Sequence, residues 1–293
     1  MSKSLGTVVD PLEAADRLGP DPLRFYLAKE IAFGQDGDFT WERFRDRYNV
    51  DLANNFGNLV SRVVSMAHRY RQGRLIVPAR EPGPLASIAT DTVSAYRRAM
   101  DGYALQQGIE AVLSLVDATN EYIATVEPWA VAKDPTRSDE LDRQLCDMAE
   151  SVRIAATLLS PVMPSACREV LGRVGTVAVG DSVDELDLDR DGVWATLPGA
   201  ERCLVKGPAL WPRLEEGVLT MNENADQQPV PEKKEPVLPV SKRRALISYS
   251  RSLVYLGALS PLLWPPMPIK SVSYTHLRAH ETSLHLVCRL LLE

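Results

Sequence analysis

Residues 48–70, YNVDLANNFGNLVSRVVSMAHRY, decide the fold class of this chain. Apolar side chains return every three or four positions along this stretch, a spacing that places them on one face of an α-helix. The members of this apolar stripe are Tyr48, Leu52, Phe56, Leu59, Val63, Met66 and Tyr70. A helix with one apolar face must bury that face against other elements. The stripe therefore predicts helical structure from Trp41 to about Gly73, packed inside a larger assembly.

Helical periodicity continues on the C-terminal side of this stretch. A long region covers about residues 85–126, a further helix about residues 138–159, and a shorter helix follows Pro164. The segments AREPGP and EPWAVAKDP separate these regions, because proline and glycine interrupt helices. No convincing alternating strand pattern occurs before residue 170. We therefore predict an all-α helical bundle.

The segment before the bundle reads as a loop followed by short helices. We expect Asp21 to cap a helix from Leu23 to Phe33, with Pro22 in its first turn and Gly34 at its end. After residue 175 the composition changes, and residues 217–293 have the polar, proline-rich and charged character of a disordered linker and tail. We expect this tail to be dispensable.

Composition limits the class of protein. Of the 293 residues, 45% are hydrophobic and 25% charged, which is an ordinary globular balance. The four cysteines form no CxxC pair, which fits a reducing compartment, and no signal peptide or membrane-length apolar run is present. The net charge of −6 disfavours non-specific nucleic-acid binding by the whole surface. Residues 41–74, however, hold seven arginines and three acids, a local excess that suits a phosphate backbone.

Two features of the helical region have the chemistry of a base-binding site. Asn58 and Arg62 are four residues apart, so their side chains leave the same face of a helix, and an amide beside a guanidinium can read the edge of an unstacked base. Trp129 follows Pro128 at a helix break, where an indole can stack on a base. The residues alone leave simpler alternatives open, a solvated polar face for Asn58 and Arg62 and a core position for Trp129.

Four segments in order carry a resemblance to a known family. MSKSLGTVVDPLEAADRLGPDPLRFYL, at residues 1–27, resembles the segment with the KMSKS signature of class I aminoacyl-tRNA synthetases. FGQDGDFTWERFRDRYNVDLANNFGNLVSR, at residues 33–62, resembles the methionyl-tRNA synthetases among them, and EPWAVAK and ALWPRLE are similar to later landmarks of that family. The resemblance covers about residues 1–216.

This resemblance implies an organisation for the whole chain. Residues 1–37 correspond to the KMSKS loop and connecting helices, and residues 38–175 to the all-α helical-bundle anticodon-binding domain of class I synthetases. Residues 176–216 form a C-terminal peptide expected to pack back on the lead-in. Residues 217–293 are a linker and a non-native tail, because SYTHLRAHET resembles a translated sequencing-adaptor read.

The activity implied is methionine–tRNA ligation, with ATP and magnesium as cofactors in the intact enzyme and the cytoplasm as its location. Lys3, with Ser2 and Ser4, would contact ATP, where positive charge meets the departing pyrophosphate. The residues alone also allow a solvated lysine. The first lysine of KMSKS, the HIGH motif and the Rossmann catalytic domain have no counterpart in the sequence, so we expect a C-terminal fragment that binds tRNA without catalysis and without a cofactor.

The same resemblance places the anticodon of tRNA-Met at Asn58, Arg62, Pro128 and Trp129, with the first two at the cytosine of the first anticodon position. The missing N-terminal catalytic domain would be the other partner, and neither a membrane nor DNA is expected. The alternative is a free-standing helical RNA-binding or scaffold module.

Two metal-like patterns are expected not to bind metal. Asp187, Asp189 and Asp191 imitate the start of a calcium loop, but Pro198 stands where the loop needs a bidentate carboxylate, so a solvated acidic loop is the interpretation. The second pattern has zinc-like spacing but lies in the adaptor-like segment. Its members are His276, His280, His285 and Cys288.

Overall fold

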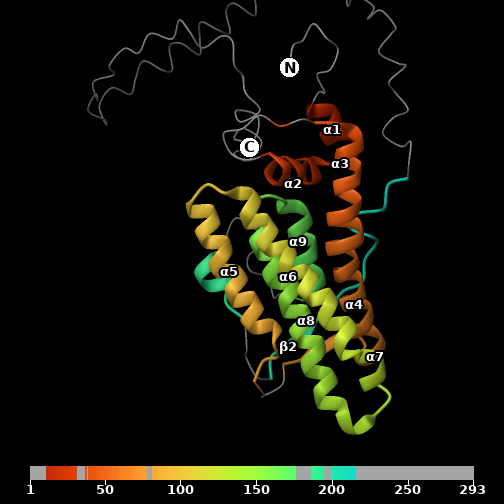
Figure 1. Ribbon diagram of the computed structural model, residues 1–293. Helices are drawn as coiled ribbons and strands as arrows, with labels where there is room; N and C mark the ends of the chain where they lie inside the picture. The colour runs from red at the N-terminus through yellow and green to blue at the C-terminus, as the bar shows by residue number, and fades with distance from the viewer. Residues whose placement is uncertain are drawn as a thin grey trace, which may run out of the picture. The chain divides into compact units, whose positions relative to one another are not determined.

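The computed structural model of the chain describes residues 11–31, 37, 39–77, 81–175, 186–194 and 199–215, all within one compact unit. This part of the chain is mostly helical, which confirms the predicted class (Figure 1). The strands of the described residues are β1 (Arg74–Ile76) and β2 (Glu201–Cys203), which pair antiparallel as a small ribbon. Neither strand was predicted, because three residues are too few to establish an alternating pattern.

A long helical rod runs through the stretch that decides the fold. It consists of α3 (Trp41–Arg47), the π-helical η2 (Tyr48–Gly57) and α4 (Asn58–Arg71), which follow one another without a gap (Figure 1). The rod begins where the Thr40 hydroxyl accepts a hydrogen bond from the Arg43 backbone N–H. It ends where Gln72 adopts left-handed backbone angles, with φ of 55°. The predicted helix is confirmed, and the π-helical turn in its middle was not anticipated.

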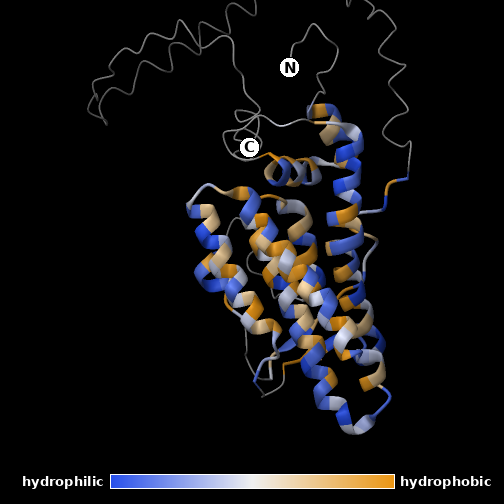
Figure 2. Ribbon diagram, viewed as in Figure 1, coloured by the Kyte–Doolittle hydropathy of each residue, from blue (hydrophilic) through white to orange (hydrophobic). Residues whose placement is uncertain are grey.

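The apolar stripe of this rod is buried for most of its length. Its first five members are almost inaccessible to solvent, whereas Met66 and Tyr70 at its C-terminal end are only half-buried. The buried part packs in the main core with apolar residues of the other helices. Figure 2 shows hydrophobic and hydrophilic residues interspersed along the helices of the bundle. The end of the stripe therefore leaves the core and becomes part of a surface.

The other helices of the bundle pack against this rod. They are α5 (Leu85–Asp101), α6 (Leu105–Val126), α8 (Ser138–Leu159) and α9 (Pro164–Arg173). The two last helices begin where the sequence predicted. The region predicted over residues 85–126 is helical, as expected, but it consists of two helices, because the chain reverses between α5 and α6 at Tyr103, whose φ is 56°. Gly102 precedes this turn, and the two helices then lie side by side.

The lead-in consists of α1 (Pro11–Leu18) and α2 (Pro20–Glu30), so the predicted limits at Leu23 and Phe33 are wrong. Asp21 also has a different role from the one expected. It lies inside α2, and its Oδ2 accepts a hydrogen bond of 2.7 Å from the backbone N–H of Ala166 in the first turn of α9. It therefore satisfies the open N-terminus of a distant helix rather than its own.

The C-terminal peptide packs on η2. The Trp211 ring lies 5.6 Å from the Phe56 ring, centroid to centroid, and Asn49 exchanges two hydrogen bonds of 2.9 Å with the backbone of Leu214. A Cβ on Gly57 would come within 3.0 Å of the indole, so a glycine is needed there for close approach. These contacts are with the bundle, and the expected packing of the peptide on the lead-in stays a prediction.

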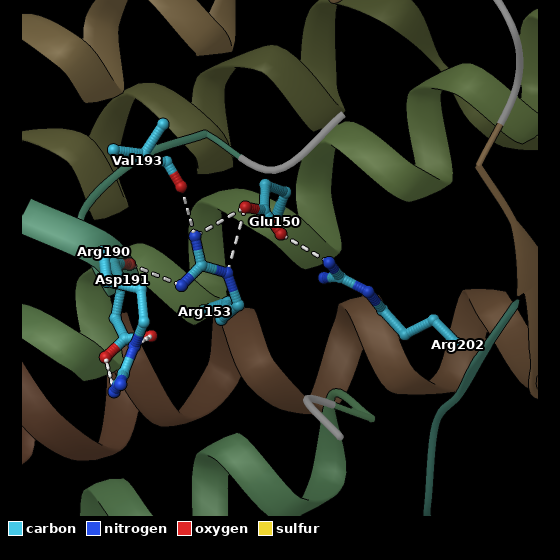
Figure 3. Close-up of polar contacts among 6 residues, drawn as sticks. All are labelled: Glu150, Arg153, Arg190, Asp191, Val193 and Arg202. Atoms are coloured by element: carbon cyan, nitrogen blue, oxygen red, sulfur yellow. Dashed lines mark hydrogen bonds and ion pairs between the residues drawn. The ribbon is translucent and has the colours of Figure 1, made fainter. Parts of the chain in front are cut away.

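A buried ionic cluster ties the C-terminal segments to α8 (Figure 3). Glu150 is bound by Arg153 at 2.6 Å and by Arg202 of β2 through its other oxygen. Arg153 also donates to the backbone carbonyls of Asp191 and Val193, which fixes the loop around α10 (Leu188–Asp191). Such a cluster positions segments and is costly to break.

The remaining sequence predictions concern the acidic run near residue 190, metal binding, membrane helices and the two ends of the chain. Asp187 caps α10 by accepting hydrogen bonds from two backbone N–H groups, so the acidic run is a helix and not an open loop. No group of three potential ligands is placed to hold a metal among the residues described. Within the same residues, no helix has the length and apolar character needed to cross a bilayer. Ser2, Lys3, Ser4 and the predicted tail lie outside them.

Candidate nucleic-acid interface

A cavity of about 340 Å³ lies between the C-terminal half of α4 and the short α7 (Pro128–Val131). Its volume falls at the lower end of the range for small-molecule sites, roughly 300–1,000 Å³. It is lined by Arg62, Ser65, Met66, Arg69, Tyr70 and Trp129. This lining combines two aromatic rings, two guanidinium groups and two hydroxyls, and none of these described residues carries a carboxylate. It suits a planar ligand with nearby negative charge.

The turn into α7 directs Trp129 outward. Glu127 ends α6 in a left-handed conformation, with φ of 43°, and Pro128 then starts α7. Pro128 and Val131 are buried against the bundle, so the residue between them points away from it. Trp129 is 41% exposed and lines the cavity. A core position for this indole is therefore excluded, and part of its surface is open to a ligand.

A chain of side-chain amides fixes Arg62. Its Nη1 donates to Oδ1 of Asn120 at 3.0 Å, and Asn120 donates to Asn55 at 3.0 Å. Asn55 in turn donates to Asp117 at 2.6 Å. A guanidinium carries five N–H donors, and this chain uses one of them. The group is thus held at the cavity while other donors stay available for a ligand.

The sequence-predicted residues are only partly brought together. Arg62 and Trp129 line the same cavity, and Pro128 supports Trp129 from the buried side. Asn58 is exposed one turn earlier on α4 and does not line the cavity. A ligand that fills the cavity can reach Asn58 only by extending along the helix.

Four lining residues were not singled out from the sequence as binding residues. Ser65, Met66, Arg69 and Tyr70 follow Arg62 at the third, fourth, seventh and eighth positions, so they share its face of α4. This spacing was the signal that would have identified them. Met66 and Tyr70 were instead assigned to the apolar stripe of the core, which the helix leaves at this end.

The predicted basic patch is largely neutralised. Five of the seven arginines in residues 41–74 form ion pairs with carboxylates: Arg43 and Arg47 with Glu30, Arg45 with Asp46, Arg71 with Asp142 and Arg74 with Glu201. Counting charges along the sequence missed this result, because three of the four carboxylates come from outside the segment. Only Arg62 and Arg69 carry their charge into the cavity lining.

Contacts between α4 and α8 support the cavity. Arg71 pairs with Asp142, and its Nη2 donates to the Ser138 hydroxyl at 2.9 Å. At the same end of α8, a bidentate hydrogen bond from Arg137 lowers the pKa of Glu140, so this carboxylate remains ionised at neutral pH. The Arg71 contacts thus hold the C-terminal end of α4 against α8, and they involve neither Arg62 nor Arg69.

Comparisons with known families divide the chain into two parts. Residues 1–64 match the family model described as tRNA synthetases class I (M). Residues 79–193 match the model described as the anticodon binding domain of methionyl tRNA ligase. Among the residues that line the cavity, Arg62 lies in the first matched part and Trp129 in the second, and the other four lie between the two parts.

Individual relatives and solved structures agree with these matches. The chain is 37% identical over 219 residues to methionine–tRNA ligase of Bacillus subtilis, covering 73% of this chain and 32% of that protein. It is 35% identical over 243 residues to the enzyme of Streptococcus pneumoniae, covering 80% and 35%. Mycobacterium tuberculosis methionyl-tRNA synthetase bound by methionyl-adenylate superposes with a TM-score of 0.63 at 32% identity, covering 72% of this chain and 41% of that one. The chain thus spans about a third of the length of the curated relatives it matches.

Proposed function

Because the chain belongs to the methionyl-tRNA synthetase family, as the end of its class I catalytic domain followed by its anticodon-binding domain, we propose that the cavity beside α4 binds one base of the tRNA-Met anticodon. An anticodon-binding domain implies tRNA as the partner. The base we propose is the cytosine at the first anticodon position. In this proposal the base stacks on Trp129, and Arg62 donates hydrogen bonds to its edge.

One observation carries this proposal: Arg62 and Trp129 line the same cavity although they come from different helices. A single-stranded base is bound by stacking and then identified by hydrogen bonds to its edge. The indole offers the stacking surface, and the guanidinium held by Asn120 offers donors, while cytosine presents a carbonyl and a ring nitrogen as acceptors. Asn58 would contribute from the rim, to a part of the nucleotide outside the cavity.

For the parent activity, we propose ATP-dependent methionine–tRNA ligation, as in the homologous ligases. Ser2, Lys3 and Ser4 remain the proposed ATP contacts, and they lie outside the described residues. The contribution we assign to residues 38–175 is tRNA binding rather than a chemical step, and the location we propose is the cytoplasm.

The test is a titration of fluorescently labelled stem-loops carrying CAU or UAU anticodons with the full chain. Trp129→Ala should weaken binding to the CAU loop by about 1–3 kcal/mol, the cost of a lost stacking contact. Arg62→Ala should weaken binding and also reduce the preference for CAU over UAU, since it removes donors to the base edge. Tyr103→Ala, which removes an exposed aromatic ring at the α5–α6 turn, is the matched control and should have no effect.

The rival function is a helical scaffold that does not read RNA. Equal binding of both loops by the wild type, together with no effect of Trp129→Ala or Arg62→Ala, would support the scaffold and contradict the anticodon assignment.

A further inference from the structure

Arg69 differs from most arginines on the rod because no carboxylate of the described residues neutralises it. Five of its neighbours in residues 41–74 are paired with acids, whereas Arg69 forms no ion pair within the described part of the chain. It is exposed and lines the cavity almost two turns after Arg62. A cation at the edge of a base-sized cavity, without an internal counter-ion, is available to an anionic ligand.

The guanidinium of Arg69 is nevertheless held in place. Its Cζ lies 5.6 Å from the centroid of the Tyr70 ring, within the range of a cation–π contact. Tyr70 itself is half-buried and packs against the main core. This contact leaves the N–H groups of Arg69 without a carboxylate partner, and a guanidinium presents them as a planar fork that matches two phosphate oxygens.

We propose that Arg69 binds a backbone phosphate of the RNA whose base occupies the cavity, and that Tyr70 is the positioning residue for its guanidinium. This inference rests on the proposed function, because it requires RNA at the cavity. It also narrows the sequence-based expectation that the arginines of residues 41–74 suit a phosphate backbone, since Glu30 and Glu201 already pair with Arg43 and Arg74. A phosphate carries no base identity, so Arg69 contributes affinity and register but no selectivity.

Salt dependence separates this role from base reading. Each phosphate contact contributes about 0.7 to the slope of log affinity against log salt concentration on a single strand. With the full chain and the CAU stem-loop, Arg69→Ala should reduce the slope by about that amount and weaken CAU and UAU binding by the same factor. Arg69→Lys should keep the slope, because it keeps the charge. Arg74→Ala, which removes an arginine that Glu201 already neutralises, should leave the slope unchanged.

The positioning role of Tyr70 has its own variants. Tyr70→Phe keeps the ring and should keep both slope and affinity. Tyr70→Leu removes the ring face and should lower the affinity of the chain for both loops while Arg69 is present. In the Arg69→Ala background, Tyr70→Leu should cause no further loss of affinity. A further loss in the double variant equal to that of Tyr70→Leu alone would show that Tyr70 acts independently of Arg69 and would overturn the positioning role.

The outcomes distinguish this inference from the function on which it rests. An unchanged slope in Arg69→Ala, while Trp129→Ala still weakens binding, overturns the phosphate contact and leaves the anticodon site standing. A loss of CAU preference in Arg69→Ala also overturns it, because the residue then reads a base. If the wild-type chain binds neither loop, the proposed function and the phosphate contact fail together.

Discussion

The two ends of the α3–α4 rod carry the same residue type in opposite states. At the α3 end, Arg43 and Arg47 both bind the carboxylate of Glu30, at 2.9 and 2.8 Å. At the α4 end, Arg62 and Arg69 face a cavity whose lining includes no acid. The first end uses its charges to join helices, whereas the second presents Arg62 and Arg69 to a ligand and uses Arg71 to join α4 to α8.

This difference shows why a local count of charges does not locate a binding surface. The excess of arginine over residues 41–74 is real in the sequence, but Glu30, Asp142 and Glu201 reach into it from outside the segment. What remains is determined by which arginines have no carboxylate within reach after folding. Variants of Arg43 and Arg47 should therefore change the stability of the fold, whereas variants of Arg62 and Arg69 should change the affinity for RNA.

The largest expected effect is a loss of stability in the part of the rod that packs on the lead-in. Lys29 of α2 and Asp51 of η2 form a buried ion pair of 2.6 Å, with each residue less than a tenth exposed. Lys29→Ala leaves the Asp51 charge buried without its partner, so the free energy of unfolding should fall by about 3–5 kcal/mol. Urea denaturation followed by circular dichroism measures this loss.

Two controls accompany Lys29→Ala. Replacing both partners, as Lys29→Met with Asp51→Leu, should recover most of the stability, because no buried charge is left over. The affinity of the folded single variant for the CAU stem-loop should stay at the wild-type value. A large loss of affinity in folded Lys29→Ala would contradict the view that one part of the rod is structural and the other binds RNA.

A second prediction concerns a buried acid without an ion pair. Asp147 of α8 is 5% exposed, accepts a hydrogen bond of 2.9 Å from the Gly83 backbone N–H, and has no ion-pair partner in the described chain. Burial raises the pKa of Asp147 from its usual 3.8 to about 6. An unpaired charge is tolerated on exposed Arg69, because water reaches it, but on buried Asp147 it should lower the stability of the fold.

The sign of the pH dependence follows from this shift. Between about pH 4 and pH 6 the folded state binds the Asp147 proton more tightly than the unfolded state, so stability falls as pH rises through this window. The expected loss is on the order of 2–3 kcal/mol above pH 6, from about 1.4 kcal/mol per pKa unit. Asp147→Asn should flatten this part of the stability–pH curve.

Local periodicity predicted much of the fold. The limits of α8 agree with the sequence prediction, and the rod begins at the expected Trp41, because long amphipathic stripes depend only on neighbouring residues. The break at Tyr103 was missed because the apolar spacing continues across it, although Gly102 was a turn signal. The role of Asp21 could not be predicted, since Ala166 is brought to it only by the packing of α2 on α9.

The binding site was harder to predict from local sequence patterns than the helices were. Nothing near Arg62 indicates that Trp129 faces it, and only the resemblance to the synthetases grouped these residues. The exposure of Trp129 depends on the left-handed turn at Glu127, a conformation that glutamate rarely adopts. The neutralisation of Arg74 depends on the pairing of β1 with β2, which joins segments far apart in the sequence. Each of these features is a product of tertiary structure.

The smallest expected effect is the sharpest test of the comparison. Arg74 is highly exposed and lies on the same chain segment as Arg69, so by sequence it is an equally good phosphate ligand. The hydrogen bond from Arg74 lowers the pKa of Glu201, so the pair remains ionised at neutral pH and an incoming phosphate would have to compete with a carboxylate already in place. Arg74→Ala should therefore change the affinity for the CAU stem-loop by less than about twofold and leave its salt dependence unaltered, while Glu201→Gln should increase the affinity by releasing the arginine. Titration at two salt concentrations measures both. A loss in Arg74→Ala as large as that in Arg69→Ala would mean that ion pairing within the protein does not decide which arginines bind RNA.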